Sequence, residues 1–160
     1  ARVSASTGAS LAACLLAGLC TLSGPRHGGA ARALLALVRD AEAMGAAEAI
    51  AHWLARDTIL PGFGHNFYPN GDPRAKLMLE GLEPGNQLRE LAERVHDMTG
   101  MAPNCDFGLA VMVEQLHLPS EAPFSLFLLG RAVGWCAHAM EQNAHGTLIR
   151  PRGRYEGPLP

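Results

Sequence analysis

The sequence predicts an all-α fold. Apolar residues recur at i, i+3 and i+4 spacing in several long segments, as they do on the buried face of a helix. No segment alternates apolar and polar residues with period two over a useful length, so no strand is expected. Of the 160 residues, 48% are hydrophobic and 18% are charged, which provides enough apolar surface for a core.

Three helices are expected in the first third of the chain. The first covers Ser6–Leu22, where leucines and small residues share one face, and Gly24-Pro25 ends it because proline cannot continue a helix. The second covers Ala30–Met44, which carries a face of leucine and valine. A short third helix follows around Ala46–Arg56.

The least helical segment is Pro61–Arg74, which contains three prolines and three glycines and is therefore expected to be a shaped loop. Asp72 and Pro73 near its end are a typical helix start, with aspartate as the N-cap and proline at the first helical position. We expect a helix over Arg74–Leu82 to follow.

Three further helices complete the prediction. The segment Asn86–Thr99 is amphipathic, with apolar residues on one side and charges opposite. The segment Asn104–Leu116 is apolar on most faces, which predicts deep burial, and Phe124–Gln142 is the most hydrophobic long helix. From Asn143 the chain becomes a basic tail rich in proline and glycine.

Charge and hydropathy exclude several classes of protein. A formal net charge of -2 gives no cationic surface for phosphates, which excludes a dedicated nucleic-acid binder. The apolar run Leu11–Leu22 is interrupted by Gly18 and is too short to span a bilayer, and no cleavage site follows it as in a signal peptide. We expect a cytoplasmic protein, and we interpret the start at Ala1 without methionine as a cut through a longer chain or as the first ordered residue of one.

The cysteines lie in apolar stretches, and none belongs to a Cys-x-x-Cys pair. This pattern predicts buried reduced thiols rather than disulfides or a zinc site. The residues concerned are Cys14, Cys20, Cys105 and Cys136.

Two histidines lie beside backbone that glycine and proline shape. His27 precedes two glycines at a helix end, where backbone can approach a ligand closely, and His65 belongs to the proline- and glycine-rich loop. The alternative for each is a turn residue that packs locally. The remaining histidines lie in or near amphipathic helices, where we expect structural or solvent-exposed roles: His52, His96, His117, His138 and His145.

Asp106 stands at the start of a nearly uncharged helix. It is either an N-terminal helix cap or a partly desolvated carboxylate, which is a better base than a solvated one. Arginines in apolar or turn settings indicate binding of a di- or tricarboxylate, although Arg150 can also be part of a solvated tail. The arginines concerned are Arg74, Arg131 and Arg150.

Six short motifs, in this order and at these separations, resemble the citrate synthase family. Together they extend over nearly the whole chain. The motifs are Gly24-Pro-Arg-His-Gly-Gly-Ala30, Pro61-Gly-Phe-Gly-His65, Asp72-Pro-Arg74, Asn104-Cys-Asp106, Leu129-Gly-Arg131 and Ile149-Arg-Pro-Arg152.

The resemblance implies an all-helical, two-domain subunit that works as a homodimer. It assigns residues 1–28 to the end of the large domain, 29–107 to the small domain, and 108–160 to the closing helix and tail of the large domain. It also implies condensation of an acyl-CoA, usually acetyl-CoA, with oxaloacetate, followed by hydrolysis of the thioester. No permanently bound cofactor and no metal are implied.

The resemblance also implies roles for individual residues. Asp106 would remove a proton from the acetyl methyl group, His27 would hydrogen-bond the thioester oxygen, and His65 would donate to the oxaloacetate carbonyl. The substrate carboxylates would be held by Arg74, Arg131 and Arg150, the last from the partner subunit. The loop near the CoA nucleotide would be Pro61, Gly62, Phe63 and Gly64.

The sequence departs from the family pattern at several places. Arg26 replaces an apolar residue before His27, the segment 66–71 lacks the basic residue of many relatives, and Phe107–Ala110 replaces a Ser/Tyr-containing turn. The upstream histidine that binds oxaloacetate in the family is absent from these residues.

The departures leave other functions open. The alternatives to a citrate synthase are a non-catalytic carboxylate or CoA sensor, a 2-methylcitrate synthase or a citryl-CoA lyase. A metal site is disfavoured because its candidate ligands lack ligand-pair spacing: His27, His65, Cys105 and Asp106.

Overall fold

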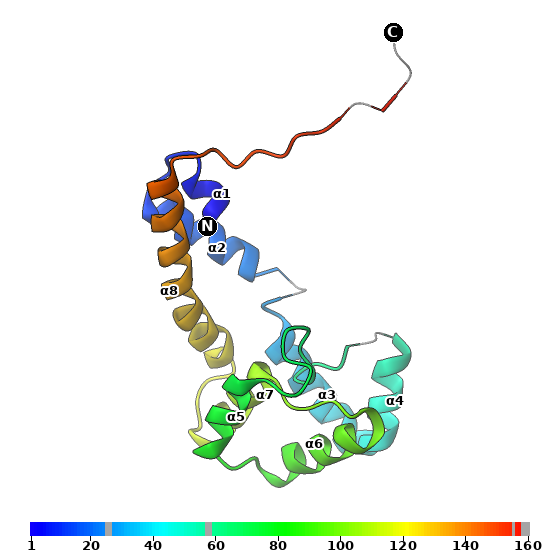
Figure 1. The fold of residues 1–160 in the computed structure, drawn as a ribbon. Helices are drawn as coiled ribbons and strands as arrows, with labels where there is room; N and C mark the ends of the chain where they lie inside the picture. The colour runs from blue at the N-terminus through cyan, green and yellow to red at the C-terminus, as the bar shows by residue number, and fades with distance from the viewer. Residues whose placement is uncertain (25–26, 57–58, 155, 158–160) are drawn as a thin grey trace. The chain divides into compact units, whose positions relative to one another are not determined.

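Residues 1–24, 27–56, 59–154 and 156–157 are described by a computed structural model, in which they form eight α-helices and no strand (Figure 1). The predicted all-α fold is confirmed. The helices are α1 (Arg2–Ala5), α2 (Leu11–Leu22), α3 (Ala30–Met44), α4 (Ala46–Arg56), α5 (Pro73–Glu80), α6 (Asn86–Thr99), α7 (Cys105–Gln115) and α8 (Ala122–His145).

The chain divides into two compact units, which are described separately here. One contains Ala1–Leu22 together with Leu128–Pro160, and the other is Ser23–Phe127. The assignment of 1–28, 29–107 and 108–160 to the large and small domains of the family stays a prediction.

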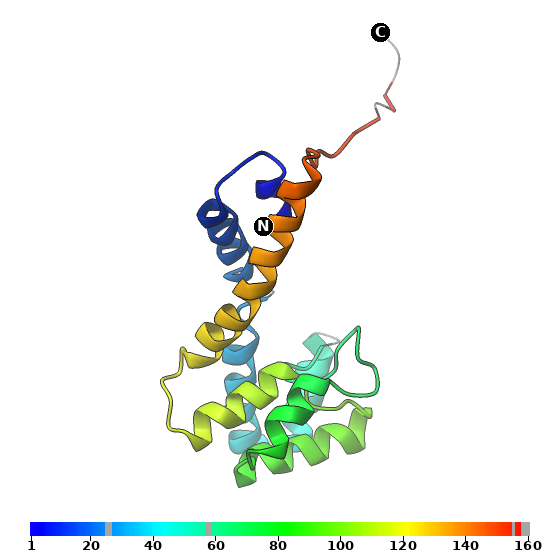
Figure 2. The same cartoon turned by 60° about the vertical axis from the view of Figure 1, so that its left-hand side comes forward.

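The unit Ser23–Phe127 has an apolar core between its helices. Helix α3 contacts α4, α6 and α7, and α5 packs against α7 (Figure 2). Residues Phe107–Val111 of α7 are all buried, which confirms the burial predicted for this segment. Each large apolar side chain contributes about 1.5–3 kcal/mol to folding. The buried cluster consists of Leu34, Leu37, Ala49, Ile50, Leu60, Phe63, Leu88, Leu91, Val95, Phe107, Ala110 and Val111.

The other unit is held by small side chains and by one polar cluster. Arg2 in α1 donates to Glu141, and its Nη2 lies 3.0 Å from Nδ1 of His138. A Cβ atom on Gly18 would lie 2.7 Å from Cδ2 of Trp135, so only glycine lets the α2 backbone pack on this indole ring. The buried apolar cluster consists of Ala5, Cys14 and Ala139.

The predicted first helix, Ser6–Leu22, begins too early. Gly8 has a φ of +79°, a left-handed conformation that a helix cannot contain. Helix α2 begins only at Leu11, where the Ser10 hydroxyl accepts a hydrogen bond from the N–H of Ala13 at 3.3 Å. Ser6, Thr7 and Ser10 beside this break are poor helix formers, so the apolar pattern supports a helix only from Leu11 on.

Two other helix ends also differ from the prediction. Helix α5 was predicted to reach Leu82 and ends at Glu80, where Gly81 follows. Helix α8 is longer than the predicted Phe124–Gln142 and ends before Gly146, which has a φ of +65° and donates to the Gln142 carbonyl at 3.1 Å. No described helix, α8 included, combines the length and the hydropathy that a bilayer span requires.

The predicted burial of the cysteines holds only in part. Cys14 is buried, Cys105 and Cys136 are half-buried, and Cys20 is exposed, so the prediction is wrong for Cys20. Cys14 shares the buried face of α2 with Leu22, eight residues on. Cys20 lies six residues after Cys14 and therefore about 240° around the helix, away from that face.

Gly18→Ala is expected to lower the free energy of unfolding, although alanine favours a helix over glycine by about 1 kcal/mol. The added Cβ would overlap the Trp135 ring, and overpacking of this kind costs about 1–3 kcal/mol. Denaturant unfolding followed by circular dichroism measures the change.

The matched control is Gly130→Ala in α8, where a Cβ would meet no atom within 4 Å. This variant should keep or slightly raise the stability of the protein. A Gly18→Ala protein as stable as the Gly130→Ala protein would contradict the close contact between α2 and Trp135.

Candidate active site

Helix α7 begins beside the candidate base. Asn104 is the N-cap of this helix, since its Oδ1 accepts a hydrogen bond from the N–H of Asp106 at 3.0 Å. Oδ2 of Asp72 accepts from the N–H of Cys105 at 2.9 Å. The interpretation of Asp106 as the helix cap is therefore wrong. Because other side chains bind these first N–H groups, the Asp106 carboxyl is not required for capping.

The Asp106 carboxyl is half-buried among ionisable groups of the same unit. Burial raises the pKa of this carboxyl, and the charges of His27 and then Arg74 act in the opposite direction. The Asp72 charge raises the pKa of Asp106 and the His65 charge lowers it, and both effects are weaker than those of His27 and Arg74. The pKa of Asp106 remains above its ordinary value. These groups belong to the same unit as Asp106, and Asp72 links Arg74 to the N–H of Cys105 beside it. The partial desolvation expected from the sequence is thus present.

The loop before His65 depends on two glycines in the left-handed region. Gly62 has a φ of +83° and Gly64 a φ of +69°. Between them, Phe63 is buried with its ring centroid 5.3 Å from that of Phe107 in α7. This aromatic contact holds the loop against the helix that carries Asp106.

A backbone hydrogen bond fixes the tautomer of neutral His65. Nδ1 of His65 accepts from the N–H of Phe67 at 3.1 Å, so the ring proton is on Nε2. The His65 ring also lies 4.9 Å from the Tyr68 ring, centroid to centroid. His65 therefore presents Nε2 as a hydrogen-bond donor, which is the capability that the predicted role requires.

Asp72 and Arg74 form a two-point ion pair at the start of α5. Asp72 is the predicted N-cap and accepts from the Arg74 N–H at 3.0 Å, from Nε at 2.9 Å and from Nη2 at 2.8 Å. Burial opposes ionisation of the Asp72 carboxyl, but hydrogen bonds from Arg74 and Cys105 outweigh it and lower its pKa. The guanidinium also lies 5.7 Å from the centre of the Tyr68 ring.

His27 lies in the turn before α3. Its N–H donates to the Gly24 carbonyl at 3.0 Å, and its exposed ring meets Phe127 edge-on at 5.7 Å between centroids. Arg26, which replaces the family's apolar residue before His27, lies outside the described residues.

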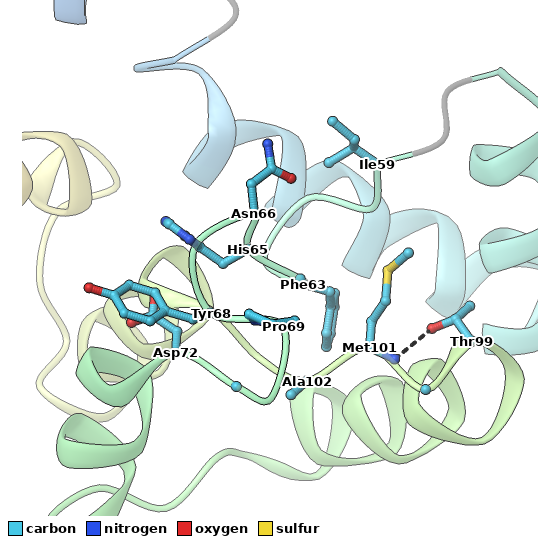
Figure 3. A pocket seen from close by; sticks show the side chains of 13 residues that line it. Ile59, Phe63, His65, Asn66, Tyr68, Pro69, Asp72, Thr99, Met101 and Ala102 are labelled. Carbon is cyan, nitrogen blue, oxygen red and sulfur yellow. Dashed lines mark hydrogen bonds between the residues drawn. The ribbon is translucent and has the colours of Figure 1, made fainter.

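A cavity of about 650 Å³ opens beside His65 (Figure 3). Of the four residues predicted to lie near the CoA nucleotide, Phe63 and Gly64 line it, and Pro61 and Gly62 do not line it. No lysine or arginine is among the described lining residues. The lining residues are Ile59, Phe63, Gly64, His65, Asn66, Tyr68, Pro69, Gly71, Asp72, Thr99, Gly100, Met101 and Ala102.

Two of the predicted carboxylate-binding arginines belong to the other unit. Arg131 is exposed on α8, and Arg150 is exposed in the extended tail. Asp106, His27, His65 and Arg74 all belong to the unit Ser23–Phe127. The roles of Arg131 and Arg150 stay predictions.

Within the described ranges, no group of three or more histidine, cysteine, aspartate or glutamate side chains could hold a metal ion.

The local sequence pattern does not reveal that Asp72 and Asn104 bind the first N–H groups of α7. Asp72 was recognised only as the cap of the following helix, although it also binds the N–H of Cys105, 33 residues later. Asn104 was recognised only as part of a motif with Asp106. The signal that could have identified it is an asparagine two residues before an acidic residue at a helix start, which is a typical N-cap arrangement.

The chain matches a known protein family over almost its whole length. Residues 1–152 match the model described as citrate synthase, C-terminal domain. The chain belongs to the citrate synthase family, as the motif resemblance predicted.

Individual relatives agree with this placement. The citrate synthase of Mycolicibacterium smegmatis is 34% identical over 171 residues, which cover 98% of this chain and 45% of that protein. The crystal structure of citrate synthase from Thermotoga maritima MSB8 has a TM-score of 0.78 at 31% identity, covering 99% of this chain and 47% of that one.

A third relative was solved with ligands bound. Citrate synthase from Thermoplasma acidophilum, in a ternary complex with carboxymethyl coenzyme A and oxaloacetate, has a TM-score of 0.74 at 29% identity, covering 99% of this chain and 47% of that one. The chain thus spans about half the length of the relatives that it matches.

Asp72→Asn is expected to destabilise the protein near neutral pH by about 2–4 kcal/mol, because it leaves partly buried donors of Arg74 without their anionic partner. The folded-state pKa of Asp72 is below its unfolded value. Its contribution is therefore complete above the unfolded value of about 3.9 and is lost as the pH falls through the folded pKa.

Urea unfolding from about pH 7 to about pH 2 measures this effect. Wild type should lose more stability over this range than Asp72→Asn. Asp97→Asn, at an exposed position of α6, is the matched control and should follow wild type. An equal acid response of wild type and Asp72→Asn would contradict the role of the ion pair.

Proposed function

We propose that the protein condenses acetyl-CoA, or another short acyl-CoA, with oxaloacetate to give citrate and CoA. The observation that carries this proposal is the half-buried Asp106 carboxyl in one unit with His27, His65 and Arg74, on a helix start that is hydrogen-bonded to Gly64 and Asp72. Burial also raises the pKa of this carboxyl. A base of this kind beside two hydrogen-bond donors and a cation suits removal of a proton next to a thioester, followed by attack on the carbonyl of an anionic substrate.

The first step in this function is enolisation. The Asp106 carboxylate takes a proton from the acetyl methyl group, and the electron pair of the broken C–H bond forms a carbon–carbon double bond. The thioester oxygen receives a hydrogen bond from His27 as it gains negative charge. A methyl group beside a thioester is a very weak acid, so base and donor must act together where water is excluded.

The second step forms the carbon–carbon bond. The enol carbon attacks the ketone carbon of oxaloacetate, and the ketone oxygen becomes an alcohol with the proton supplied from Nε2 of His65. The hydrogen bond from the Phe67 N–H to Nδ1 of this ring supports the assignment, since it leaves the proton on Nε2. Water then cleaves the citryl thioester, which releases citrate and the thiol of CoA.

The charges of the substrates require further groups. Arg74 binds one substrate carboxylate with the guanidinium N–H groups that Asp72 does not occupy, and Arg131 and Arg150 bind the others. The CoA part of the acyl-CoA binds along the loop Pro61–Gly64 and in the cavity beside His65. Since the described lining of this cavity holds no basic residue, the loop contributes no ion pair to the CoA phosphates.

The working form in this proposal is a cytoplasmic homodimer, with Arg150 acting across the interface. Large apolar side chains stay exposed on α2 and α8 when the chain stands alone, which supports association through these helices. The most exposed of them are Leu16, Leu129, Val133 and Met140.

The proposed function is tested by release of free CoA from acetyl-CoA and oxaloacetate, measured with a thiol reagent on the full-length protein. Release of CoA that depends on oxaloacetate is the expected result. If neither acetyl-CoA nor propionyl-CoA releases thiol, the proposal fails. Tight citrate binding by such an inactive protein would instead favour the carboxylate sensor.

Asp106→Asn is expected to lower kcat by about 10²–10⁴-fold, because the amide cannot accept the methyl proton. The variant keeps the shape of the side chain and the Asn104 cap, so unfolding should stay near the wild-type transition. Asp97→Asn is again the control and should retain full activity.

The pH profile of kcat/KM tests whether the reaction depends on ionisation of the Asp106 carboxyl. Only the ionised carboxylate is a base, so activity falls as the pH drops through the pKa of Asp106. Because burial raises that pKa, the acid limb should lie above the ordinary aspartate value of about 3.9. An active Asp106→Asn protein with an unchanged acid limb would rule Asp106 out as the base.

Val133→Glu in α8 is expected to convert the dimer into monomers, because it places a charge in the proposed interface. Sedimentation velocity measures the association state. The matched control is Leu77→Glu in α5, since Leu77 is 71% exposed and Val133 is 73% exposed. A monomeric wild type, or a Val133→Glu protein that stays dimeric, would contradict this interface.

A further inference from the structure

One amide side chain connects the loop that ends at His65 to the helix that carries Asp106. Nδ2 of Asn104 donates to the Gly64 carbonyl at 3.0 Å, across 40 positions of sequence. Oδ1 of the same side chain accepts from the N–H of Asp106 at 3.0 Å. Both ends of the Asn104 amide are therefore used, one on each side of the site.

Backbone hydrogen bonds reinforce this connection. The N–H of Asn104 donates to the Gly62 carbonyl at 2.9 Å, and the N–H of Gly64 donates to the Ala102 carbonyl at 2.9 Å. These bonds hold the two segments side by side, but neither of them contacts the peptide bond between Gly64 and His65. Among the described residues, the group that binds the carbonyl oxygen of that peptide bond is the Asn104 side chain.

The bond to Gly64 determines how the His65 peptide is oriented. Gly64 is in the left-handed region with a φ of +69°, where glycine has wide conformational freedom and needs an external partner to fix it. The same side chain fixes the N–H of Asp106, so His65 and Asp106 are placed relative to one another through a single rigid amide. Displacement of a reacting group by about 1 Å can cost about 10²-fold in rate.

We propose that Asn104 is a positioning residue for the condensation, which holds His65 and Asp106 at a fixed separation. This inference rests on the proposed function. Asparagine alone among the good N-cap residues offers a donor that reaches across to Gly64 while its oxygen caps the helix. Aspartate has the same shape without the donor, and serine caps the helix but is shorter.

The test uses Asn104→Ser and Asn104→Asp in the full-length protein. Both keep the N-cap acceptor, and they differ in charge, so what they share is the loss of the donor to Gly64. We expect kcat to fall about 10- to 100-fold in both, with KM for each substrate within about twofold of wild type. Unfolding should stay close to wild type, and amide hydrogen exchange in 62–66 should become faster.

Asn86→Ser is the matched control, since Asn86 is an exposed asparagine at the start of α6, and its kcat should not change. Wild-type kcat in Asn104→Ser would overturn the positioning role while the proposed function stands. A loss of activity that only follows a loss of folded protein would also overturn it. A wild-type protein that releases no CoA would overturn the proposed function itself, together with the inference that rests on it.

Discussion

The start of α7 is the point on which the rest of the site depends. The first N–H groups of any helix need acceptors, and here they are bound by Asn104 and Asp72. Asp72 is itself held by Arg74 at the start of α5, so one set of hydrogen bonds joins two helix starts. Because capping is achieved by these residues, the Asp106 carboxyl can face the other ionisable groups of the site.

The packing that stabilises the fold also changes the pKa of the candidate base, Asp106. Asp106 is carried by a helix whose next residues are buried, and Phe107 packs on Phe63 of the loop before His65. The same packing removes water from the Asp106 carboxyl and raises its pKa, while His27 and nearby cations limit the rise. A change in this core would therefore alter both stability and the acidity of the base.

Local sequence predicted the elements well where the chain has a regular pattern. The bounds of Ala30–Met44 and Asn86–Thr99 agree with the structure, because their apolar residues repeat with the helical period between clear glycine boundaries. The prediction failed at Gly8, where a left-handed glycine interrupts the segment, and at Cys20, whose side of α2 depends on what the helix packs against. The motifs include His65, Asp106 and Asn104, but they do not reveal that the Asn104 side chain connects the other two segments.

The sequence by itself determined the all-α class, the positions of most helices and the residue types that the site needs. Each of these features depends on residues a few positions apart, so the local hydrophobic pattern is enough to predict it. Only the tertiary structure decided that Asn104 reaches Gly64, that Asp72 binds Cys105 and that burial raises the pKa of Asp106. Such bonds and desolvation arise between segments far apart in the chain, and they exist only once the core has brought those segments together.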